Sequence, residues 1–355
     1  MERRNTRAVN VGGVTIGGGA AVSVQSMTKT HTEDTDATLR QIEQLAQAGC
    51  EIVRCAVANR RAARCLAEIV AGSALPVIAD VHFEPDLAMR AIESGAHGVR
   101  VNPCTISDRE GLRRVYRRAA ESAIKVRIGI NSGSVRPREG LQVRQEAEEE
   151  DLAAMMVREA LAACEEARGE GCAALVLSLK ASDVPTTVRA YRLAAERCDY
   201  PFHLGVTAAG PPRISLVKSA VGIGALLMEG IGDTIRVSMT GPPHEEVEAA
   251  LRILEAAGLR EPTGPQIFSC PTCGRCNVDI RALVDEVSER LKGCDKNIKV
   301  AVMGCVVNGP GEAAECDVGV AGGKDFGYVF CKGKKVEKRP ASELADALMD
   351  QIRRL

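Results

Sequence analysis

The chain has 355 residues, which is long enough for two domains that each bury a core. Its 46 Lys and Arg residues balance 47 Asp and Glu residues, and the net charge of −1 gives no basis for long-range attraction to nucleic acid or to an anionic membrane. Aromatic residues make up 3% of the chain and Trp is absent, which counts against a base-stacking surface. We therefore expect neither nucleic acid nor membrane as a partner.

The fourteen cysteines are the unusual part of this composition, although they are too dilute for a small disulfide-bonded scaffold. Residues 1–13 include charged side chains and no long apolar segment, so they predict no signal peptide. The longest apolar run, residues 221–228, is too short to cross a bilayer. We expect a cytoplasmic protein whose reduced thiols serve as core residues, metal ligands or redox groups.

Residues 1–260 alternate short β-branched runs with longer segments of helical periodicity, which is typical of βα units around a parallel sheet. The predicted strands are 22–25, 52–54, 77–79, 98–101, 126–130, 175–177, 203–206 and 235–237, and helices are predicted at 36–48, 60–70, 85–94 and 244–257. Eight such units predict an α/β fold of the (β/α)₈ TIM-barrel type. A doubly wound sheet would need a glycine-rich phosphate turn after its first strand, but Gly17–Gly19 precede that strand.

Polar residues close or follow nearly every predicted strand, at the end of the barrel where such enzymes place their chemistry. Five of them are the cations Arg54, Arg100, Arg127, Lys180 and Arg236. Converging cations repel each other unless carboxylates or an anionic ligand neutralise them, and guanidinium groups bind phosphate through paired hydrogen bonds. We therefore predict a site for a small ligand with two phosphate groups. For any single cation, pairing with a buried carboxylate is the alternative.

The uncharged or acidic residues at these strand ends form a second group of candidates. They are Asp80, His82, Asn102, Asn131, Ser178 and Ser238. Such side chains can bind hydroxyl groups or assist proton transfer.

Residues 266–355 form the predicted second domain, after a linker at 259–265 that contains two prolines and a glycine. This domain carries Cys270 and Cys273 in the run S-C-P-T-C-G-R and Cys305 in the run M-G-C-V-V-N-G-P-G-E. A C-x-x-C pair in a Pro/Gly turn presents two thiolates to one metal centre. Because structural zinc sites commonly have a second C-x-x-C pair, the spacing favours an iron–sulfur site over zinc or a thioredoxin-like dithiol.

Several segments together resemble the 4-hydroxy-3-methylbut-2-enyl diphosphate synthase family of the non-mevalonate isoprenoid pathway. They are residues 80–83, 100–103, 127–132, 178–182, 230–238, 269–275 and 303–312. The resemblance implies a TIM barrel followed by a smaller α/β [4Fe-4S] domain, with the cluster bound by Cys270, Cys273, Cys305 and Glu312. It also implies an oxidoreductase that opens the ring of 2-C-methyl-D-erythritol 2,4-cyclodiphosphate and removes its C3 oxygen as water.

The same resemblance assigns roles and partners. Asp80, His82 and Glu312 are implied to be catalytic, and the other strand-end residues named above, including all five cations, are implied to bind the substrate. Ferredoxin or flavodoxin is implied as the electron donor. The resemblance further implies a homodimer in which the cluster domain of one subunit closes over the barrel mouth of the other.

Two positions depart from the family pattern. After the seventh strand the family has T-E-A-G where this chain has Thr207 to Gly210 as T-A-A-G, so Ala208 replaces the expected catalytic glutamate. A missing general acid costs about 10²–10⁴ in rate, which predicts a low-activity variant, engineered or natural, that still binds substrate and assembles its cluster. Cys276 is also unexpected and competes with the assigned metal ligands.

Two other functions remain possible on the residues alone. The cysteines of the second domain could form a zinc-stabilised interaction module attached to an inactive barrel. Alternatively, the barrel could resemble that of a pterin-dependent methyltransferase, for which the cysteine-rich domain would have no counterpart. Metal and sulfide content would separate the first of these from the iron–sulfur interpretation.

Overall fold

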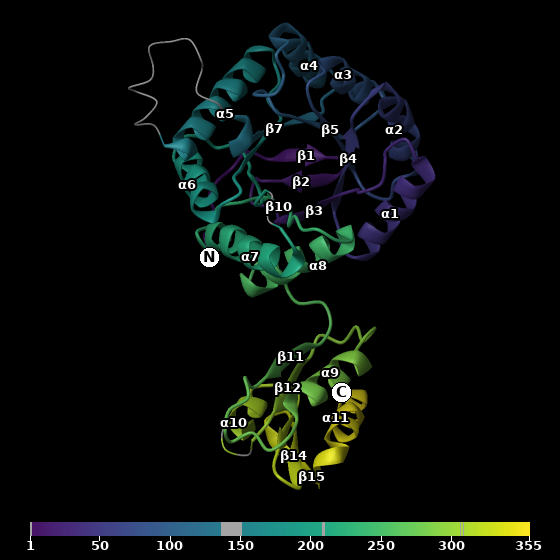
Figure 1. The fold of residues 1–355 in the computed structure, drawn as a ribbon, viewed down its shortest axis with the longest axis vertical. Helices are drawn as coiled ribbons and strands as arrows, with labels where there is room; N and C mark the ends of the chain where they lie inside the picture. The colour runs from purple at the N-terminus through teal and green to yellow at the C-terminus, as the bar shows by residue number, and fades with distance from the viewer. Residues whose placement is uncertain (1, 136–150, 208–209, 306, 308) are drawn as a thin grey trace. The chain divides into compact units, whose positions relative to one another are not determined.

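The computed structural model describes residues 2–135, 151–207, 210–305, 307 and 309–355. The chain divides into two compact units, Met1–Arg260 and Glu261–Leu355, which we call unit 1 and unit 2 and describe separately (Figure 1). The division falls inside the Pro- and Gly-containing segment 259–265. None of the helices in the described ranges has the length and apolar character that a bilayer crossing requires.

Unit 1 is built on a parallel sheet whose strand order is β8-β7-β6-β5-β4-β3-β10-β9. Among the described residues its strands are β3 (Ser23–Met27), β4 (Ile52–Val57), β5 (Val77–Val81), β6 (Gly98–Val101), β7 (Lys125–Asn131), β8 (Leu175–Lys180), β9 (His203–Leu204) and β10 (Thr234–Ile235). A parallel bridge between Leu177 of β8 and Phe202, just before β9, joins the two edges. The sheet therefore curves into a nearly closed barrel, and the predicted TIM-barrel fold is confirmed.

The strands β4 and β8 extend three residues beyond their predicted ends, whereas the last two strands of unit 1 end early. The strand β9 ends at Leu204, two residues earlier than expected, and β10 covers Thr234–Ile235 where 235–237 was predicted. Gly205 follows β9, and a Cβ atom at this position would lie 2.6 Å from the Lys180 ammonium nitrogen and 2.7 Å from the Arg236 carbonyl oxygen. The glycine therefore leaves room for a charged side chain where the regular strand ends.

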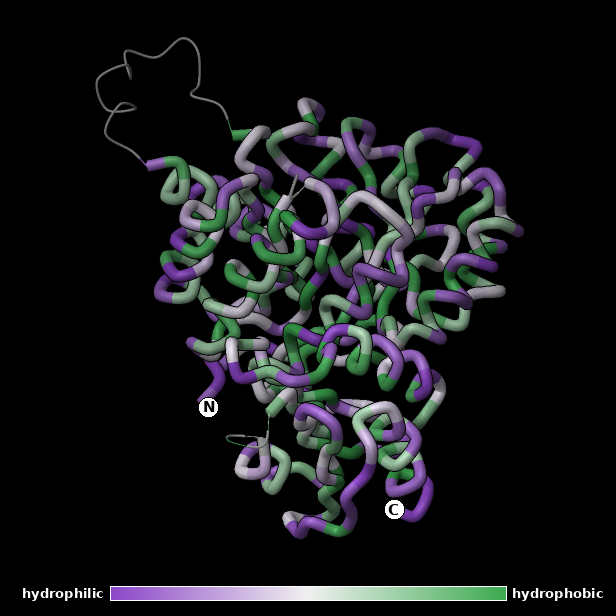
Figure 2. Tube along the Cα trace, turned by 60° about the horizontal axis from the view of Figure 1, so that its bottom comes forward, coloured by the Kyte–Doolittle hydropathy of each residue, from purple (hydrophilic) through white to green (hydrophobic). Residues whose placement is uncertain are grey.

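Helices cover the outside of the barrel (Figure 1). They are α1 (Thr35–Gln47), α2 (Arg60–Gly72), α3 (Pro85–Glu93), α4 (Arg109–Glu121), α5 (Leu152–Gly169), α6 (Val184–Ala195), α7 (Pro212–Met228) and α8 (Pro243–Ala256), with a short 3₁₀ helix η1 at Ser132–Ser134. Asp34, Asn59 and Asp183 begin three of them by accepting backbone hydrogen bonds from the first turn. Their apolar faces pack on outward-facing strand residues such as Val53 and Ile128, and Figure 2 shows the hydrophilic segments along the outer helices.

A short antiparallel hairpin that the sequence analysis did not predict lies across the barrel in Figure 1. It consists of β1 (Val9–Val11) and β2 (Val14–Ile16), joined by two glycines with positive φ angles. Val11 and Ile16 are fully buried and cluster with Ile52 and Ile78, which lie near the beginnings of β4 and β5. The hairpin therefore covers the amino end of the barrel, and the carboxyl end is left for ligand binding.

The cysteines of unit 1 serve mainly in packing. Cys50, Cys55, Cys164 and Cys172 are buried within the hydrophobic core. Burial raises the pKa of Cys50 to about 12 and the pKa values of Cys55 and Cys172 to about 11. These thiols therefore stay protonated at neutral pH and fill apolar space, as the sequence interpretation expected.

Unit 2 contains, in its described part, a mixed sheet in the order β11-β12-β13-β14-β15. Its elements are β11 (Gln266–Ser269), α9 (Ile280–Arg290), β12 (Lys299–Met303), α10 (Gly309–Ala314), β13 (Val318–Gly322), β14 (Phe326–Cys331), β15 (Lys334–Pro340), the 3₁₀ helix η2 (Ala341–Glu343) and α11 (Leu344–Arg354). The helices bury residues such as Val287 and Leu348 against Val300 and Val318 of the sheet. The predicted α/β character of this part is confirmed.

The sheet of unit 2 brings its two cysteine motifs to one edge. The strands β11 and β12 are parallel neighbours, with Ser269 paired to Val302. Cys270 follows the last residue of β11, and Gly304 and Cys305 follow the last residue of β12. Because parallel neighbours end on the same side, two motifs that are far apart in sequence meet at the carboxyl edge of this sheet.

Candidate active site

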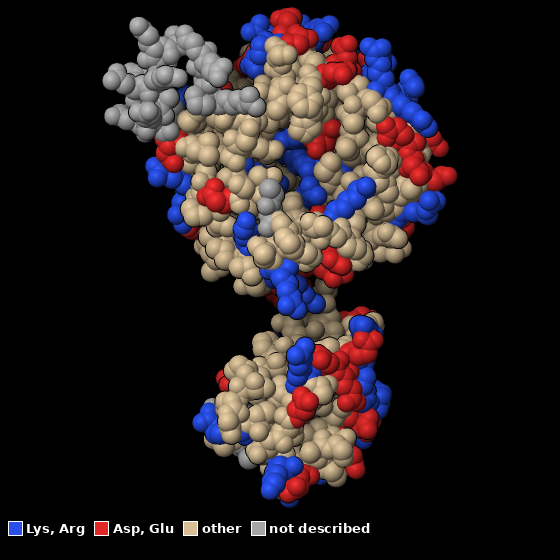
Figure 3. Space-filling view, viewed as in Figure 1, with Lys and Arg blue, Asp and Glu red and all other residues tan. Residues whose placement is uncertain are grey.

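The predicted cations gather at the carboxyl end of the barrel. Arg54, Arg100, Arg127 and Lys180 lie on β4, β6, β7 and β8, and Arg236 follows β10. Figure 3 shows Lys and Arg side chains lining the hollow at the centre of unit 1. Burial, followed by the charges of Arg54, Arg127 and Arg236, holds the pKa of Lys180 well below its ordinary value. The structure therefore places these five side chains within electrostatic reach of one another.

Asp80 at the end of β5 holds two of these cations. Its Oδ2 atom lies 3.4 Å from Arg54 Nε, and its Oδ1 atom lies 3.1 Å from Arg100 Nη1. The same Oδ1 atom lies 3.7 Å from Nε2 of His82, and that nitrogen is 2.6 Å from Arg100 Nη1. Gly129 on the neighbouring strand lets Arg100 lie flat, because a Cβ atom there would meet Arg100 Nε at 2.7 Å.

The charge states in this group follow from burial and neighbouring charges. Burial alone would raise the pKa of Asp80, but Arg54 and Arg100 beside it hold that pKa below its ordinary value. Burial and the charge of Arg100 lower the pKa of His82, so its imidazole is neutral near pH 7 and Nε2 accepts the hydrogen bond from Arg100. Asp80 is therefore an ionised group that positions two guanidinium groups, and proton donation by it does not fit this environment.

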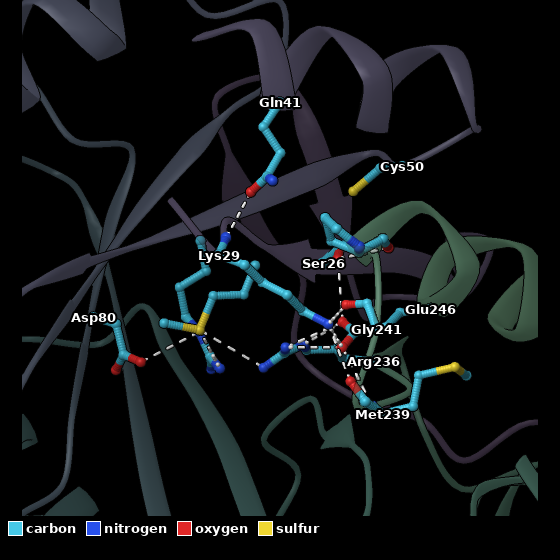
Figure 4. Close-up of polar contacts among 12 residues, drawn as sticks. Ser26, Lys29, Gln41, Cys50, Asp80, Arg236, Met239, Gly241 and Glu246 are labelled. Atoms are coloured by element: carbon cyan, nitrogen blue, oxygen red, sulfur yellow. Dashed lines mark hydrogen bonds and ion pairs between the residues drawn. The ribbon is translucent and has the colours of Figure 1, made fainter. Parts of the chain in front are cut away.

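Glu246, in the first turn of α8, plays the corresponding part for Arg236 (Figure 4). Its carboxylate is 1% exposed and lies 3.1 Å from Arg236 Nη2 and 3.0 Å from the Lys29 ammonium group. It also accepts hydrogen bonds from the Ser26 hydroxyl at 3.3 Å and the Met239 amide at 3.2 Å. These contacts satisfy the buried charge and fix the direction of Arg236.

A neutral sulfur atom separates two of the guanidinium groups. The thioether of Met27, at the end of β3, accepts hydrogen bonds from Arg54 Nη2 at 3.2 Å and from Arg236 Nη1 at 3.7 Å. Burial, partly offset by Asp80, lowers the pKa of Arg54 to about 10, and the charge of Arg236 contributes to this shift. The two arginines therefore lie close enough for their charges to interact, with no carboxylate between them among these contacts.

Deeper in the barrel, the positive charge has few partners. Arg127 is 1% exposed, and its one hydrogen bond in the described residues is a 3.5 Å contact to Gln25, which leaves Nε unpaired there. Lys180 Nζ lies 3.3 Å from Nε2 of the fully buried His203. Burial and neighbouring cations hold the pKa values of Arg127 and His203 well below their ordinary values. An anionic ligand would relieve this unbalanced charge.

Next to the cations lies a cavity of about 1190 Å³ at the ends of β6 and β7. His82, Asn102, Asn131 and Thr207 contribute to its wall. The Asn102 side chain is buried, donates to the Ser134 hydroxyl at 3.0 Å and accepts from the Cys104 amide at 3.1 Å. The amides thus border a space large enough for a small organic ligand.

The remaining predicted residues of unit 1 are placed as follows. Ser178 is buried on β8, whereas Ser238 is half-buried after β10. Ala208, the position of the missing family glutamate, lies outside the described residues.

The two cysteine motifs of unit 2 line one cavity of about 260 Å³. Its lining includes Cys270, Cys273, Cys276, Cys305, Met303, Gly304 and Glu312. All four predicted cluster ligands therefore face a common space, together with the competing Cys276. Within the described residues, however, no group of three or more His, Cys, Asp or Glu side chains is already arranged to hold a metal ion.

The contacts around Gly304 show how well this cavity suits an iron–sulfur cluster. Its backbone amide donates a hydrogen bond to Cys270 Sγ at 3.3 Å, the type of contact that tunes cluster potentials. A Cβ atom at this position would lie 2.3 Å from Cys276 Sγ and 3.3 Å from Cys270 Sγ. The glycine therefore keeps open a space lined by sulfur atoms and a backbone N–H group, which fits a thiolate-bound cluster.

Both units of the chain match domains of one known protein family. Residues 6–251 match the GcpE TIM-barrel domain, and residues 266–354 match the GcpE protein C-terminal domain. The chain belongs to the GcpE family. This finding confirms the resemblance seen in the sequence motifs.

Curated relatives of the GcpE chain align over nearly its whole length. A protein of Thermodesulfovibrio yellowstonii is 49% identical and covers 100% of both chains, and one of Geobacter sulfurreducens is 48% identical and covers 99% of this chain and 98% of its own. A protein of Aquifex aeolicus is 46% identical, with 100% and 98% covered. All three are named 4-hydroxy-3-methylbut-2-en-1-yl diphosphate synthase (flavodoxin).

Solved structures resemble unit 1 in fold. Yersinia pestis dihydropteroate synthase with a pterine-sulfa conjugate is 14% identical, has a TM-score of 0.51, and covers 71% of this chain and 98% of its own. At this identity the likeness shows the barrel fold and carries no information on ligands. The pterin-dependent alternative therefore gains no support beyond the fold.

Sequence reasoning missed Glu246 and Met27, which contact the arginines of this site, and Lys29, which pairs with Glu246. Glu246 lies in a helix rather than at a strand end, so a search of strand ends passes over it. The run of Pro and acidic residues at 242–246 is a helix-start signal that placed a carboxylate in the first turn of α8. Helix first turns after each strand are therefore a second place to look for site residues.

Proposed function

We propose that the chain acts as a 4-hydroxy-3-methylbut-2-enyl diphosphate synthase that receives its electrons from flavodoxin. The reaction opens the ring of 2-C-methyl-D-erythritol 2,4-cyclodiphosphate reductively and removes the C3 oxygen as water. The observation that carries this proposal is the cationic barrel mouth, where five cations face only the two carboxylates of Asp80 and Glu246 among the described ion pairs. Both units of the chain also match the GcpE family. The curated relatives bear the name of this activity.

In the proposed complex, the five cations bind the two phosphate groups. Arg54 and Arg100 already have their guanidinium planes directed by Asp80, and Arg236 is directed by Glu246. Such fixed donors bind phosphate at a small entropic cost, because little side-chain freedom remains to be lost. Arg127 and Lys180 have the weakest neutralisation and gain most from a dianionic ligand.

The uncharged residues are proposed to orient the carbon skeleton. Asn102, Asn131, Ser178 and Ser238 offer hydrogen bonds to hydroxyl and ester oxygens. His82 is neutral with Nε2 accepting from Arg100, so its proton lies on Nδ1 and is available to a substrate oxygen. Ala208 cannot supply the carboxylate that the family pattern provides, which supports the proposal of low activity.

In unit 2, Cys270, Cys273, Cys305 and Glu312 are proposed to hold a [4Fe-4S] cluster. When bound, this group supplies two electrons one at a time and a Lewis-acidic iron. The chain's own contribution is the sulfur-lined cavity, the Gly304 amide that donates to Cys270 Sγ, and the turn that carries the C-x-x-C pair. Donation to a ligand sulfur stabilises the reduced state.

The proposed partners follow from the same assignment. Flavodoxin is the proposed electron donor, in line with the names of the curated relatives, and ferredoxin is the alternative. A homodimer and a cytoplasmic location are also proposed, on the family resemblance and on the reduced thiols that an iron–sulfur enzyme needs. Molar mass measured by light scattering tests the dimer.

Product formation under anaerobic conditions tests the proposed function. The protein is given reduced flavodoxin and the cyclodiphosphate, and the diphosphate product is detected by mass spectrometry. We expect slow product formation that requires Cys270, so that Cys270→Ser abolishes it, while Cys50→Ser in the barrel core serves as the thiol control. A protein that carries its cluster and binds the cyclodiphosphate, yet forms no product even as Ala208→Glu, contradicts the proposal.

A further inference from the structure

One side chain in the unit 2 cavity has no role in the function proposed above. Cys276 lies three residues after Cys273 and lines the same cavity as the four assigned ligands. The cavity therefore contains four thiols and one carboxylate, which is one donor more than a [4Fe-4S] cluster uses. The following inference rests on the proposed function, because it concerns how that cluster is held.

The position of the Cys276 sulfur is defined by Gly304. A Cβ atom at Gly304 would lie 2.3 Å from Cys276 Sγ and 3.3 Å from Cys270 Sγ, so the two sulfur atoms lie beside the same backbone position. The backbone around Cys276 is also anchored to both motifs. Its amide donates to the Cys273 carbonyl at 2.9 Å, and the Asn277 amide donates to the Gly304 carbonyl at 2.9 Å. These hydrogen bonds fix the backbone of Cys276 beside the cavity that its side chain lines.

Among the described contacts, the Cys276 thiol makes one hydrogen bond and packs partly on the core of unit 2. It donates to the Val278 carbonyl at 3.1 Å, and the residue is half-buried. Rotation about the side-chain bond breaks this contact without moving the anchored backbone. Glu312, by contrast, is exposed in the first turn of the short helix α10. Iron–sulfur clusters favour soft thiolate ligands over carboxylates.

We propose that Cys276 is a reserve ligand for the iron that Glu312 would hold. When the carboxylate leaves, the Cys276 thiol releases its proton to solvent, gives up the Val278 carbonyl and binds the same iron as a thiolate. The step exchanges one anionic ligand for another and involves no oxidation or reduction. Its consequence is retention of the fourth iron during periods in which Glu312 is displaced.

Iron content and cluster spectroscopy of single and double variants test this assignment without measuring activity. Glu312→Ala, Cys276→Ala and the double variant are purified anaerobically beside the parent protein. Cys294→Ala is the control, because Cys294 is half-buried and packs on the core of unit 2 but does not line the cavity. Iron and acid-labile sulfide are counted, and paramagnetic resonance after mild oxidation detects a three-iron cluster.

We expect Glu312→Ala and Cys276→Ala each to keep about four irons per chain, and the double variant to fall to about three and to show the three-iron signal. The Glu312→Ala protein should also have a lower reduction potential than the parent, since a thiolate replaces the carboxylate. Equal iron loss in the Glu312→Ala variant and in the double variant overturns the inference. Iron loss in the Cys276→Ala variant also overturns it. A parent protein that binds no iron instead refutes the proposed function itself.

Discussion

Replacing Glu246 by Gln gives the sharpest test of how the barrel mouth is stabilised. The substitution keeps the shape of the side chain and removes the charge that faces Arg236 at 3.1 Å and Lys29 at 3.0 Å. The amide can still accept from the Met239 backbone amide, so the loss is chiefly electrostatic. Arg236 would then share its surroundings with Arg54 and with no buried carboxylate of its own.

The size of the effect follows from burial. Removing one partner of a buried ion pair costs about 3–5 kcal/mol, and the Arg236–Glu246 pair is of this kind because the two side chains are 12% and 1% exposed. Lys29 is 32% exposed, so its pair adds about 0–1 kcal/mol. At about 2–4 °C per kcal/mol, a loss of about 3 kcal/mol lowers the unfolding midpoint of unit 1 by about 6–12 °C.

Calorimetric or denaturant unfolding of the two proteins measures this difference. Glu248→Gln is the matched control, because Glu248 is an exposed residue of the same helix and should change the unfolding free energy by less than about 0.5 kcal/mol. Inorganic pyrophosphate should recover part of the loss, since it supplies negative charge at the mouth. A Glu246→Gln protein as stable as the Glu248→Gln control would refute the electrostatic reasoning.

Three other predictions follow from the two sites. Because burial lowers the pKa of Lys180, a bound anion should raise it again, so cyclodiphosphate binding takes up a proton and weakens as pH rises through the raised pKa. Titration calorimetry in buffers of different ionisation enthalpy measures this uptake, which Lys180→Met should reduce, and equal uptake in the two proteins contradicts the prediction. Gly304→Ala should reduce cluster iron severalfold, because its methyl group would lie 2.8 Å from the buried Ile280 Cγ1 and 3.3 Å from the Sγ atom of the ligand Cys270. Gly274→Ala, which has open space for its methyl group, should keep its iron, and equal iron in both variants contradicts this prediction. Ala208→Glu should raise turnover by about 10²–10⁴, and an unchanged rate would remove the proposed role of that carboxylate.

The barrel could be predicted because its strands and helices are coded locally. Alternating β-branched runs and amphipathic segments set the order of the elements, and parallel strands bring Arg54, Arg100 and Arg127 to one end by geometry alone. The cysteine motifs could be placed for a similar reason, since each follows a strand of unit 2 and those strands are neighbours.

The partners of the charges could not be predicted in this way. Whether a given arginine faces Asp80, Glu246 or open space depends on side-chain direction at the barrel end, which strand spacing does not determine. The sequence analysis considered carboxylate pairing for each cation separately, and it holds for Arg54, Arg100 and Arg236, whereas Arg127 has no ion pair among the described contacts. The hairpin β1–β2 was missed although Gly12-Gly13 between two β-branched runs is a recognised hairpin signal.

The metal and sulfide content of anaerobically purified protein tests most directly whether unit 2 holds a redox centre. Our account predicts about four iron and four acid-labile sulfide per chain, bound through the cavity that Cys270, Cys273, Cys305 and Glu312 line. Cys270→Ser should lose this content, whereas Cys294→Ser should retain it. Zinc without labile sulfide would contradict the account and would identify unit 2 as a structural module on a barrel with no source of electrons.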